Sequence, residues 1–346
     1  MKKFLITGGA GFIGSTIVEK LLKLRHKVII IDNFNNFYDY NKKIQNILES
    51  TNNCKNKEFF SNFLSKDEKI TKLKKICDSD NFILEYSDIR NTEEMDRIFS
   101  KHEIDLVFNA AAMAGVRPSL IEPTLYEEVN IRGYMNILEL CKKYEIKKFV
   151  QASSSSVYGN NKEVPFKETD IVDFAISPYA ATKKSGEVIG HVYHKLYGID
   201  MVQLRFFTVY GPKQRPDLAI HKFTKMILEE KEIPFYGDGT TSRDYTYIDD
   251  IIDGILKSIN YLFKNEKVYE IFNLGGSHVV SLKKMVEAIE TTLGKKAILN
   301  KQPIQPGDVE KTYADITKAK KILGYNPTTN FEDGIRKFIE WYKNTI

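Results

Sequence analysis

The sequence predicts an α/β fold, a Rossmann-type doubly wound parallel sheet with a smaller C-terminal lobe. The first observation is a strand, turn, helix and strand in succession. Residues 3–7 (KFLIT) are apolar and end at glycines, residues 16–26 (TIVEKLLKLRH) place apolar side chains at helical spacing, and residues 28–32 (VIIID) form a second apolar run. The second observation is that these runs do not alternate with polar residues, which indicates strands buried on both faces.

The third observation is that this unit recurs along the chain. Helices are expected from about Glu93, from about Tyr126 and after Pro178. Further strands are expected at residues 81–88 (NFILEYSD), 105–112 (DLVFNAAA), 147–154 (KKFVQASS), 201–207 (MVQLRFF) and 269–276 (YEIFNLGG). Strands that alternate with helices predict βαβ units and therefore a parallel sheet.

The regular alternation of strands and helices ends after residue 208, and we expect a second lobe there. Loop residues precede a helix at 222–231, and the tail has two amphipathic segments at 282–294 and 331–343. The expected Rossmann domain is 1–208, with returns at about 244–258 and 268–276, and the expected lobe is 209–243 together with 277–346. Residues 51–80 are predicted to be polar and partly helical, without an assigned function.

Composition excludes several classes of protein. The 346 residues are 42% hydrophobic, and no apolar run approaches the roughly 18 residues of a membrane span. The apolar start is broken by glycines too early for a signal peptide, so we expect a cytoplasmic protein. The net charge of +5 comes from dispersed lysines, which favours a solvated surface over a nucleic-acid patch. Three cysteines without a CxxC pair indicate a reducing compartment and no structural metal.

The first turn, GGAGFIG, has the glycine spacing of a dinucleotide-binding turn. Gly8, Gly11 and Gly14 follow a strand and open a helix, where small residues let the backbone approach a pyrophosphate. Asp32 ends the next strand, and a carboxylate there binds both ribose hydroxyls and repels a 2′-phosphate. These residues predict NAD rather than NADP as the cofactor.

Other cofactor contacts are expected at the carboxyl ends of strands, where ligands of such sheets bind. A side chain at the end of the third strand can meet an adenine edge, and small residues after the fourth let a dinucleotide lie against the sheet. The full predicted cofactor set is Gly8, Gly11, Phe12, Ile13, Gly14, Asp32, Asn33, Asp88, Ile89, Ala110, Ala111, Ala112, Asn130, Tyr179, Lys183 and Phe207.

Residues 179–183 (YAATK) place a phenol and an ammonium at positions i and i+4 of an expected helix. A tyrosine with a pKa of about 10 is a poor base near neutral pH, and a nearby cation favours its phenolate. Because the pair follows a glycine-rich turn and four buried strands, we interpret it as a reacting site rather than a surface pair.

Four motifs together resemble the extended short-chain dehydrogenase/reductase family over nearly the whole chain, and within it the nucleotide-sugar 4-epimerases. They are TGGAGFIG (7–14), ASSSSVYG (152–159), YAATK (179–183) and RFFTVYGP (205–212). The resemblance implies a catalytic triad of Ser154, Tyr179 and Lys183. Ser154 would bind the sugar O4, Tyr179 would exchange its proton, and Lys183 would hold the nicotinamide ribose and lower the pKa of the tyrosine.

The four consecutive serines favour epimerisation over dehydration. Similar sugar 4,6-dehydratases carry Asp and Glu at the two positions before VYG, and this sequence has Ser155 and Ser156. Without an acid at these positions, expulsion of a hydroxyl group lacks its general acid. Hydride removal and return therefore remain as the predicted chemistry.

The likeness extends to the UDP-glucuronate 4-epimerases. Simpler galactose epimerases lack an arginine at the position of Arg117 and usually carry asparagine at that of Thr208, and Arg215 and Gln305 complete the resemblance. Small hydroxyls and an arginine suit a sugar carboxylate. The full predicted substrate set is Arg117, Ser154, Ser155, Ser156, Tyr179, Thr208, Arg215, Lys222, Tyr236, Arg243, Gln305 and Asp308.

The sequence thus predicts an NAD-dependent UDP-sugar 4-epimerase that interconverts UDP-glucuronate and UDP-galacturonate. The alternatives are a UDP-glucose or UDP-N-acetylglucosamine 4-epimerase and, in a different class, a non-catalytic NAD-binding regulator. Relatives of the last kind usually lose the Tyr or Lys that this chain retains. Similar proteins are homodimers through the helix from about Tyr126 and the helix that carries Tyr179, so we expect a homodimer.

Overall fold

The computed structural model describes residues 1–59, 64–276, 278–303 and 309–345. It divides into two compact units. The first consists of Met1–Ser153, Ala181–Gln203 and Ile259–Glu270, and the second of Ser154–Ala180, Leu204–Ser258 and Ile271–Ile346. This division differs from the one expected from the sequence in four segments. Residues 154–180, residues 204–208, the expected return at 244–258 and residues 271–276 all group with the second unit.

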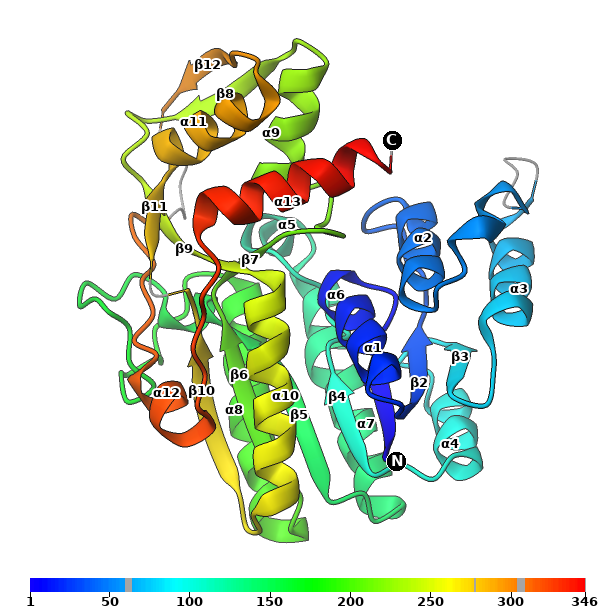
Figure 1. Ribbon diagram of the computed structural model, residues 1–346. Coiled ribbons are helices and arrows are strands. Elements are labelled where there is room, and N and C mark those ends of the chain that lie inside the picture. Colours follow the sequence, from blue (N-terminus) through cyan, green and yellow to red (C-terminus); the bar gives the residue numbers. More distant parts are fainter. Residues whose placement is uncertain (60–63, 277, 304–308, 346) are drawn as a thin grey trace. The chain divides into compact units, whose positions relative to one another are not determined.

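A seven-stranded sheet carries the fold, in the order β10-β6-β5-β4-β1-β2-β3 (Figure 1). Its pairs β1–β2, β1–β4, β2–β3 and β4–β5 are parallel. The strand order reverses between β1 and β4, the point at which Rossmann folds bind their ligands. The fold class predicted from the apolar runs is confirmed. The strands are β1 (Lys3–Thr7), β2 (Lys27–Asp32), β3 (Phe82–Tyr86), β4 (Leu106–Asn109), β5 (Lys148–Ser154), β6 (Asp200–Phe206) and β10 (Tyr269–Leu274).

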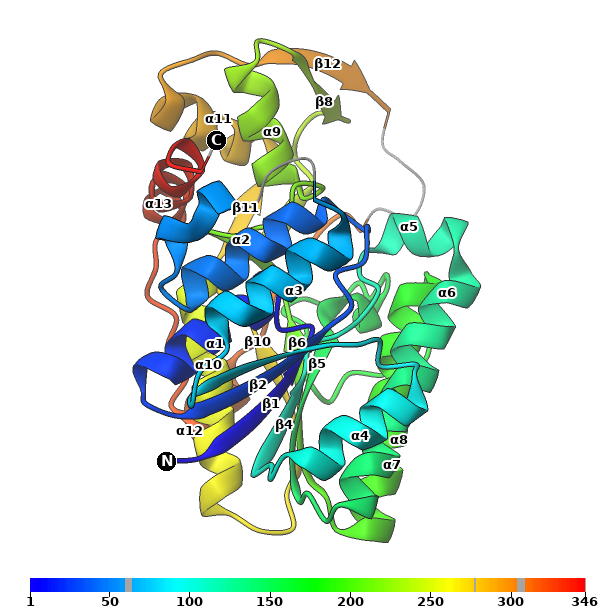
Figure 2. The ribbon, with the colours of Figure 1, turned by 90° about the vertical axis from the view of Figure 1, so that its right-hand side faces the viewer.

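Helices cover both faces of the first unit's strands. In Figure 2, α1 (Phe12–Lys23) lies on one face, and α4 (Thr92–Lys101) and α7 (Tyr134–Lys143) lie on the other. A buried apolar cluster fills the layer against α4 and α7, and α8 (Pro178–Tyr197) contributes to it. The cluster includes Leu5, Ile29, Ile31, Met95, Ile98, Phe99, Ile137, Leu138, Phe149 and Tyr193.

The polar excursion after β2 forms a helix pair. The helices α2 (Tyr40–Ser50) and α3 (Lys66–Cys77) flank the 3₁₀ turn η1 (Cys54–Phe59). A capping box between Ser65 and Glu68 starts α3, because these side chains satisfy backbone N–H groups that the first turn leaves open. The prediction that this segment is partly helical is confirmed.

Three short segments connect β4 to α7. They are α5 (Val116–Ile121), α6 (Pro123–Glu127) and the π-helical turn η2 (Glu128–Gly133). The last runs directly into α7. Single π-turns inside helices are frequent at functional sites.

The second unit contains two small sheets. The strands β7 (Thr208–Tyr210), β9 (Ser242–Tyr247) and β11 (Val279–Ser281) form one, and β8 (Glu232–Tyr236) and β12 (Ile298–Gln302) form the other. Its remaining elements are η3 (Ser155–Tyr158), α9 (Ala219–Leu228), α10 (Ile248–Lys264), which ends in the first unit, α11 (Leu282–Leu293), α12 (Thr317–Leu323) and α13 (Phe331–Lys343). The two amphipathic tail segments are therefore helices. Across the described ranges, no helix combines the length and the apolar character that a membrane span requires.

Candidate active site

The glycine turn of the first unit is packed too closely for side chains at two positions. Gly8 has a φ of +66°, and a Cβ there would lie 2.8 Å from the backbone nitrogen of Ala111. A Cβ on Gly14 would lie 2.2 Å from the carbonyl oxygen of Gly8. The turn therefore presents bare backbone at the start of α1, the arrangement that fits a pyrophosphate.

Asp32 is buried at the end of β2 and ties two loops together. Its carboxylate accepts hydrogen bonds from the backbone nitrogens of Ala10, at 3.0 Å, and Phe34, at 2.8 Å. The ammonium of Lys43, which is also buried, lies 3.7 Å from it and donates to Asn35 at 2.9 Å. Lys43 was not predicted, because no spacing rule relates a residue on α2 to the end of β2.

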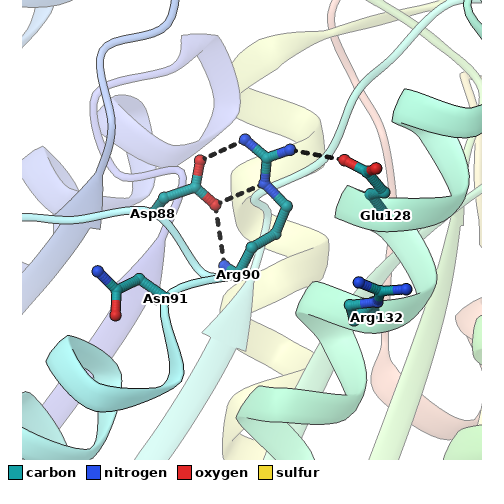
Figure 3. Close-up of a pocket in the computed structure, with 5 residues that line it drawn as sticks. All are labelled: Asp88, Arg90, Asn91, Glu128 and Arg132. Carbon is teal, nitrogen blue, oxygen red and sulfur yellow. Dashed lines mark hydrogen bonds and ion pairs between the residues drawn. The ribbon is translucent and has the colours of Figure 1, made fainter.

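The residues at the end of β3 form a charged network (Figure 3). Asp88 accepts from the backbone and guanidinium of Arg90 and from the amide of Asn33, at 2.7 to 3.0 Å. Burial raises the pKa of Asp88, but the hydrogen bonds from Arg90 and Asn33 outweigh it and leave the pKa below its ordinary value. The other end of Arg90 donates to Glu128 at 2.9 Å.

This network lines a cavity of about 410 Å³, together with Asn91 and Arg132 (Figure 3). Because Asp88 already accepts four hydrogen bonds, a carboxylate has no further lone pair in this arrangement for an adenine amine. The adenine contact predicted for Asp88 and Ile89 stays a prediction.

Hydrogen bonds to neighbouring elements hold Asn130 and the alanines after β4 in place. Ala110 and Ala111 donate backbone N–H groups to Thr7. Asn130, on η2, accepts from the backbone nitrogen of Met113 at 2.8 Å, and its amide donates to the carbonyl of Met113 and the hydroxyl of Thr182. Its side chain therefore positions the loop after β4 against α8.

Lys183 is buried in the first unit. Its ammonium donates to the carbonyl oxygen of Ala152 at 2.7 Å. Burial lowers the pKa of Lys183 to about 8, because desolvation disfavours the charged form. A small change of surroundings is therefore enough to change its charge near neutral pH.

Ser154 and Tyr179, both in the second unit, are brought together as predicted. Burial raises the pKa of Tyr179, and a hydrogen bond with Ser154 and the charge of Arg215 lower it only in part. The net pKa lies above the ordinary value, and the lowering by Lys183 that the resemblance implies stays a prediction. Tyr179 and Lys183 do share α8, one turn apart, as their spacing predicted.

The serine run continues into η3. The Ser154 hydroxyl accepts from the backbone nitrogen of Ser156 and donates to its hydroxyl, both at 3.1 Å. Ser155 and Ser156 are half-buried in this turn. In the same unit, Thr208 begins β7 and pairs with Tyr245 of β9. These hydroxyls lie on short, backbone-paired segments.

Arg215 lies in the loop between β7 and α9. Its guanidinium makes a two-pronged ion pair with Asp217, at 3.0 and 2.7 Å. Asp217 was not singled out from the sequence, although an acid two residues after a predicted anion-binding arginine is a signal that could have found it. A bidentate pair of this kind fixes the plane of the guanidinium.

The remaining predicted residues are scattered over surface, strand and core. Arg117 on α5 and Lys222 on α9 are exposed, and Tyr236 ends β8. Arg243 donates to the carbonyl of Ser242 at 2.9 Å.

The ring of Phe207 is buried against Tyr158 and Phe166, so this side chain is part of the core of the second unit. Gln305 and Asp308 lie outside the described residues. Among the residues that are described, no cluster suited to a metal ion is found.

A family model described as GDP-mannose 4,6 dehydratase matches residues 5–73 and 60–338. The chain belongs to this family. It is 42% identical over 347 residues to a UDP-glucuronate 4-epimerase of Thermodesulfobacterium geofontis, with 100% of this chain and 98% of that protein covered.

Solved structures agree with this membership. A UDP-glucuronic acid 4-epimerase from Bacillus cereus, in complex with UDP-glucuronic acid and NAD, has 36% identity and a TM-score of 0.85, with 99% of this chain and 100% of that chain covered. A UDP-glucose 4-epimerase from Thermotoga maritima with UDP-glucose has 32% identity and a TM-score of 0.83, with 99% of each chain covered. This member of the GDP-mannose 4,6 dehydratase family thus resembles epimerases over its whole length.

Proposed function

We propose that this protein is an NAD-dependent 4-epimerase that interconverts UDP-glucuronate and UDP-galacturonate. The observation that carries the proposal is the serine turn, in which Ser155 and Ser156 take the two positions that are acidic in similar dehydratases. The likeness to UDP-glucuronate 4-epimerases over the full chain supports it. The close backbone packing at Gly8 and Gly14 fits NAD.

The proposed mechanism uses one phenol as both base and acid. Tyr179 takes the proton from the sugar O4, and Ser154, which hydrogen-bonds Tyr179, holds that oxygen in place. NAD supplies the acceptor for the C4 hydride and later its donor. The 4-keto sugar turns about its diphosphate linkage between the two transfers, and Tyr179 then returns its proton to O4.

The sugar carboxylate makes the 4-keto intermediate fragile. It is a β-keto acid, so the bond between C5 and C6 can break, CO₂ leaves, and the electron pair remains on the sugar as an enolate that is protonated at C5. This loss requires the breaking bond to align with the carbonyl π system. We propose that Ser155, Ser156 and Thr208 hold the carboxylate out of that alignment by hydrogen bonds.

The protective role predicts a change of product rather than a simple loss of rate. Conversion of Ser155, Ser156 or Thr208 to alanine should raise the fraction of UDP-pentose by-product about tenfold, which corresponds to about 1.4 kcal/mol of barrier difference. Chromatography of the nucleotide sugars measures it. Formation of the epimer alone by all three variants would refute the role.

The experiment that tests the function is incubation of purified protein with UDP-glucuronate alone, followed by chromatography. We expect UDP-galacturonate without added reductant. Parallel incubations with UDP-glucose and UDP-N-acetylglucosamine separate the neutral-sugar alternatives. A protein that binds NAD but converts none of the three sugars would be the non-catalytic regulator instead.

We further propose a cytoplasmic homodimer that associates through α7 and α8. Val188, Val192 and Leu196 form an exposed apolar stripe at helical spacing on α8, and Met135 on α7 is also exposed. Exposed apolar stripes of this kind mark interaction surfaces. Val192→Glu should shift the mass in sedimentation to that of the monomer, with exposed Val164→Glu as a matched control.

A further inference from the structure

Tyr158, the last residue of η3, is a buried phenol whose hydroxyl group has two partners. It accepts a hydrogen bond from the guanidinium of Arg205 at 2.9 Å and donates one to the amide oxygen of Asn273 at 2.7 Å. The guanidinium also lies over the Tyr158 ring, 4.9 Å from its centre. Arg205 is only 1% exposed, so its charge is buried with the Tyr158 phenol.

Asn273 extends this arrangement to two other segments, one around Phe166 and Glu168 and one at Asp315. Its amide nitrogen donates to the carbonyl oxygens of Phe166, at 2.9 Å, and Asp315, at 3.2 Å, and its backbone nitrogen donates to Glu168 at 2.9 Å. The Tyr158 ring stacks on Phe166 at 4.7 Å. Burial raises the pKa of Tyr158, so the phenol stays neutral and keeps its proton for Asn273.

The two ends of the Arg205–Tyr158 hydrogen bond stand next to the predicted carboxylate-binding hydroxyls. Tyr158 follows Ser156 by two residues in η3, and Arg205 precedes Thr208 by three residues at the end of β6. One buried contact therefore joins the serine turn to the threonine segment. Arginine suits this contact because its planar guanidinium group stays charged throughout the pH range in which proteins are active.

We propose that Tyr158 and Arg205 are positioning residues that fix the Ser155–Ser156 turn relative to Thr208, and thereby decide whether the 4-keto sugar is epimerised or loses CO₂. This inference rests on the proposed function. It assigns a specificity role to two side chains outside the predicted site. Neither residue exchanges a proton with the sugar, and both act through the hydroxyls they hold.

The test compares Tyr158→Phe with Tyr325→Phe. Tyr325 is a second buried phenol of the same unit, and it donates to the carbonyl of Gly275 at 3.0 Å, so its hydrogen bond involves neither η3 nor β7. Each variant loses one buried hydroxyl and keeps its ring, and thermal unfolding measures the stability that each one loses. The readout is the ratio of UDP-pentose products to UDP-galacturonate from UDP-glucuronate, which does not depend on how much of the sample is folded.

We expect Tyr158→Phe to raise this ratio about tenfold and Tyr325→Phe to leave it at the wild-type value. Arg205→Lys, which keeps the charge and loses the fork, should move the ratio in the same direction, and it replaces Tyr158→Phe if that variant does not fold. Equal ratios for both phenylalanine variants, with an active wild type, would overturn the inference. A wild type that does not epimerise UDP-glucuronate would overturn the proposed function instead.

Discussion

Tyr179 and Tyr158 have hydroxyl groups in opposite situations. The hydroxyl group of Tyr158 accepts a hydrogen bond from Arg205 and donates one to Asn273, and both partners belong to the second unit. Tyr179 shares a hydrogen bond with Ser154, a hydroxyl that can act as donor or acceptor, and is under the influence of Arg215. Burial raises the pKa of both phenols.

The difference shows what separates a structural phenol from a reacting one. A phenol between a permanent donor and a permanent acceptor has one low-energy arrangement of its proton. A phenol beside a serine can reverse the direction of its hydrogen bond when it gains or loses a proton. Burial alone therefore does not identify the base, but the chemistry of the hydrogen-bond partners does.

The largest expected effect concerns Tyr179, the reacting phenol of this comparison. Tyr179→Phe removes the group that carries the proton and should lower kcat for epimerisation by about 10²–10⁴-fold. Because the glycine turn is untouched, the variant should still bind NAD in a fluorescence titration. A variant that epimerises at the wild-type rate would remove Tyr179 from the mechanism.

Lys183→Met is expected to lower the activity and to raise the free energy of unfolding. A pKa of about 8 in place of the ordinary 10.5 corresponds to about 3 kcal/mol of destabilisation of the charged form. Loss of the hydrogen bond to Ala152 leaves its carbonyl without this donor, which costs about 1 kcal/mol.

Urea unfolding at pH 7 should therefore show the Met variant about 2 kcal/mol more stable than the wild type. Because the pKa of Lys183 is lowered on folding, its penalty is fully present below about pH 8 and diminishes as the pH rises toward 10.5. The advantage of the variant should shrink over that range. A constant difference across the range would contradict the assigned pKa.

The smallest expected effect concerns the charge near Tyr179. Arg215 lowers the pKa of that phenol, so Arg215→Gln should raise it and shift the alkaline rise of kcat to higher pH. Asp217→Asn, which loosens the ion pair but keeps the arginine, is the matched control and should shift the profile less. Identical pH profiles for wild type and Arg215→Gln would show that this charge does not act on the base.

The first unit was largely predictable because its signals are local. Unalternating apolar runs gave the strands, and the glycines of the first turn have one conformational reason each, which the φ of Gly8 and the packing of Gly14 bear out. The pair Tyr179 and Lys183 was found by helical spacing. The clustering of Ser154 with Tyr179 came from a resemblance, since 25 residues separate them in the chain.

The buried networks were not predictable. Arg205 follows a hydrophobic strand pattern, and nothing in its neighbours indicates that it meets Tyr158, 47 residues away. Lys43 and Arg90 likewise act through residues that only the folded sheet brings near. The boundaries between the units differ from the expected ones for a related reason. They depend on which segments pack together in the folded chain, and composition along the sequence does not show that.

The chain passes between the two units inside regular elements. The passages at residues 153–154, 180–181, 203–204, 258–259 and 270–271 fall within β5, α8, β6, α10 and β10. No single cut in the gene would therefore release either unit intact, and each fragment would end in a broken strand or helix. Neither unit can therefore be transplanted as one continuous segment, and a chimera with a relative would have to exchange side chains rather than modules.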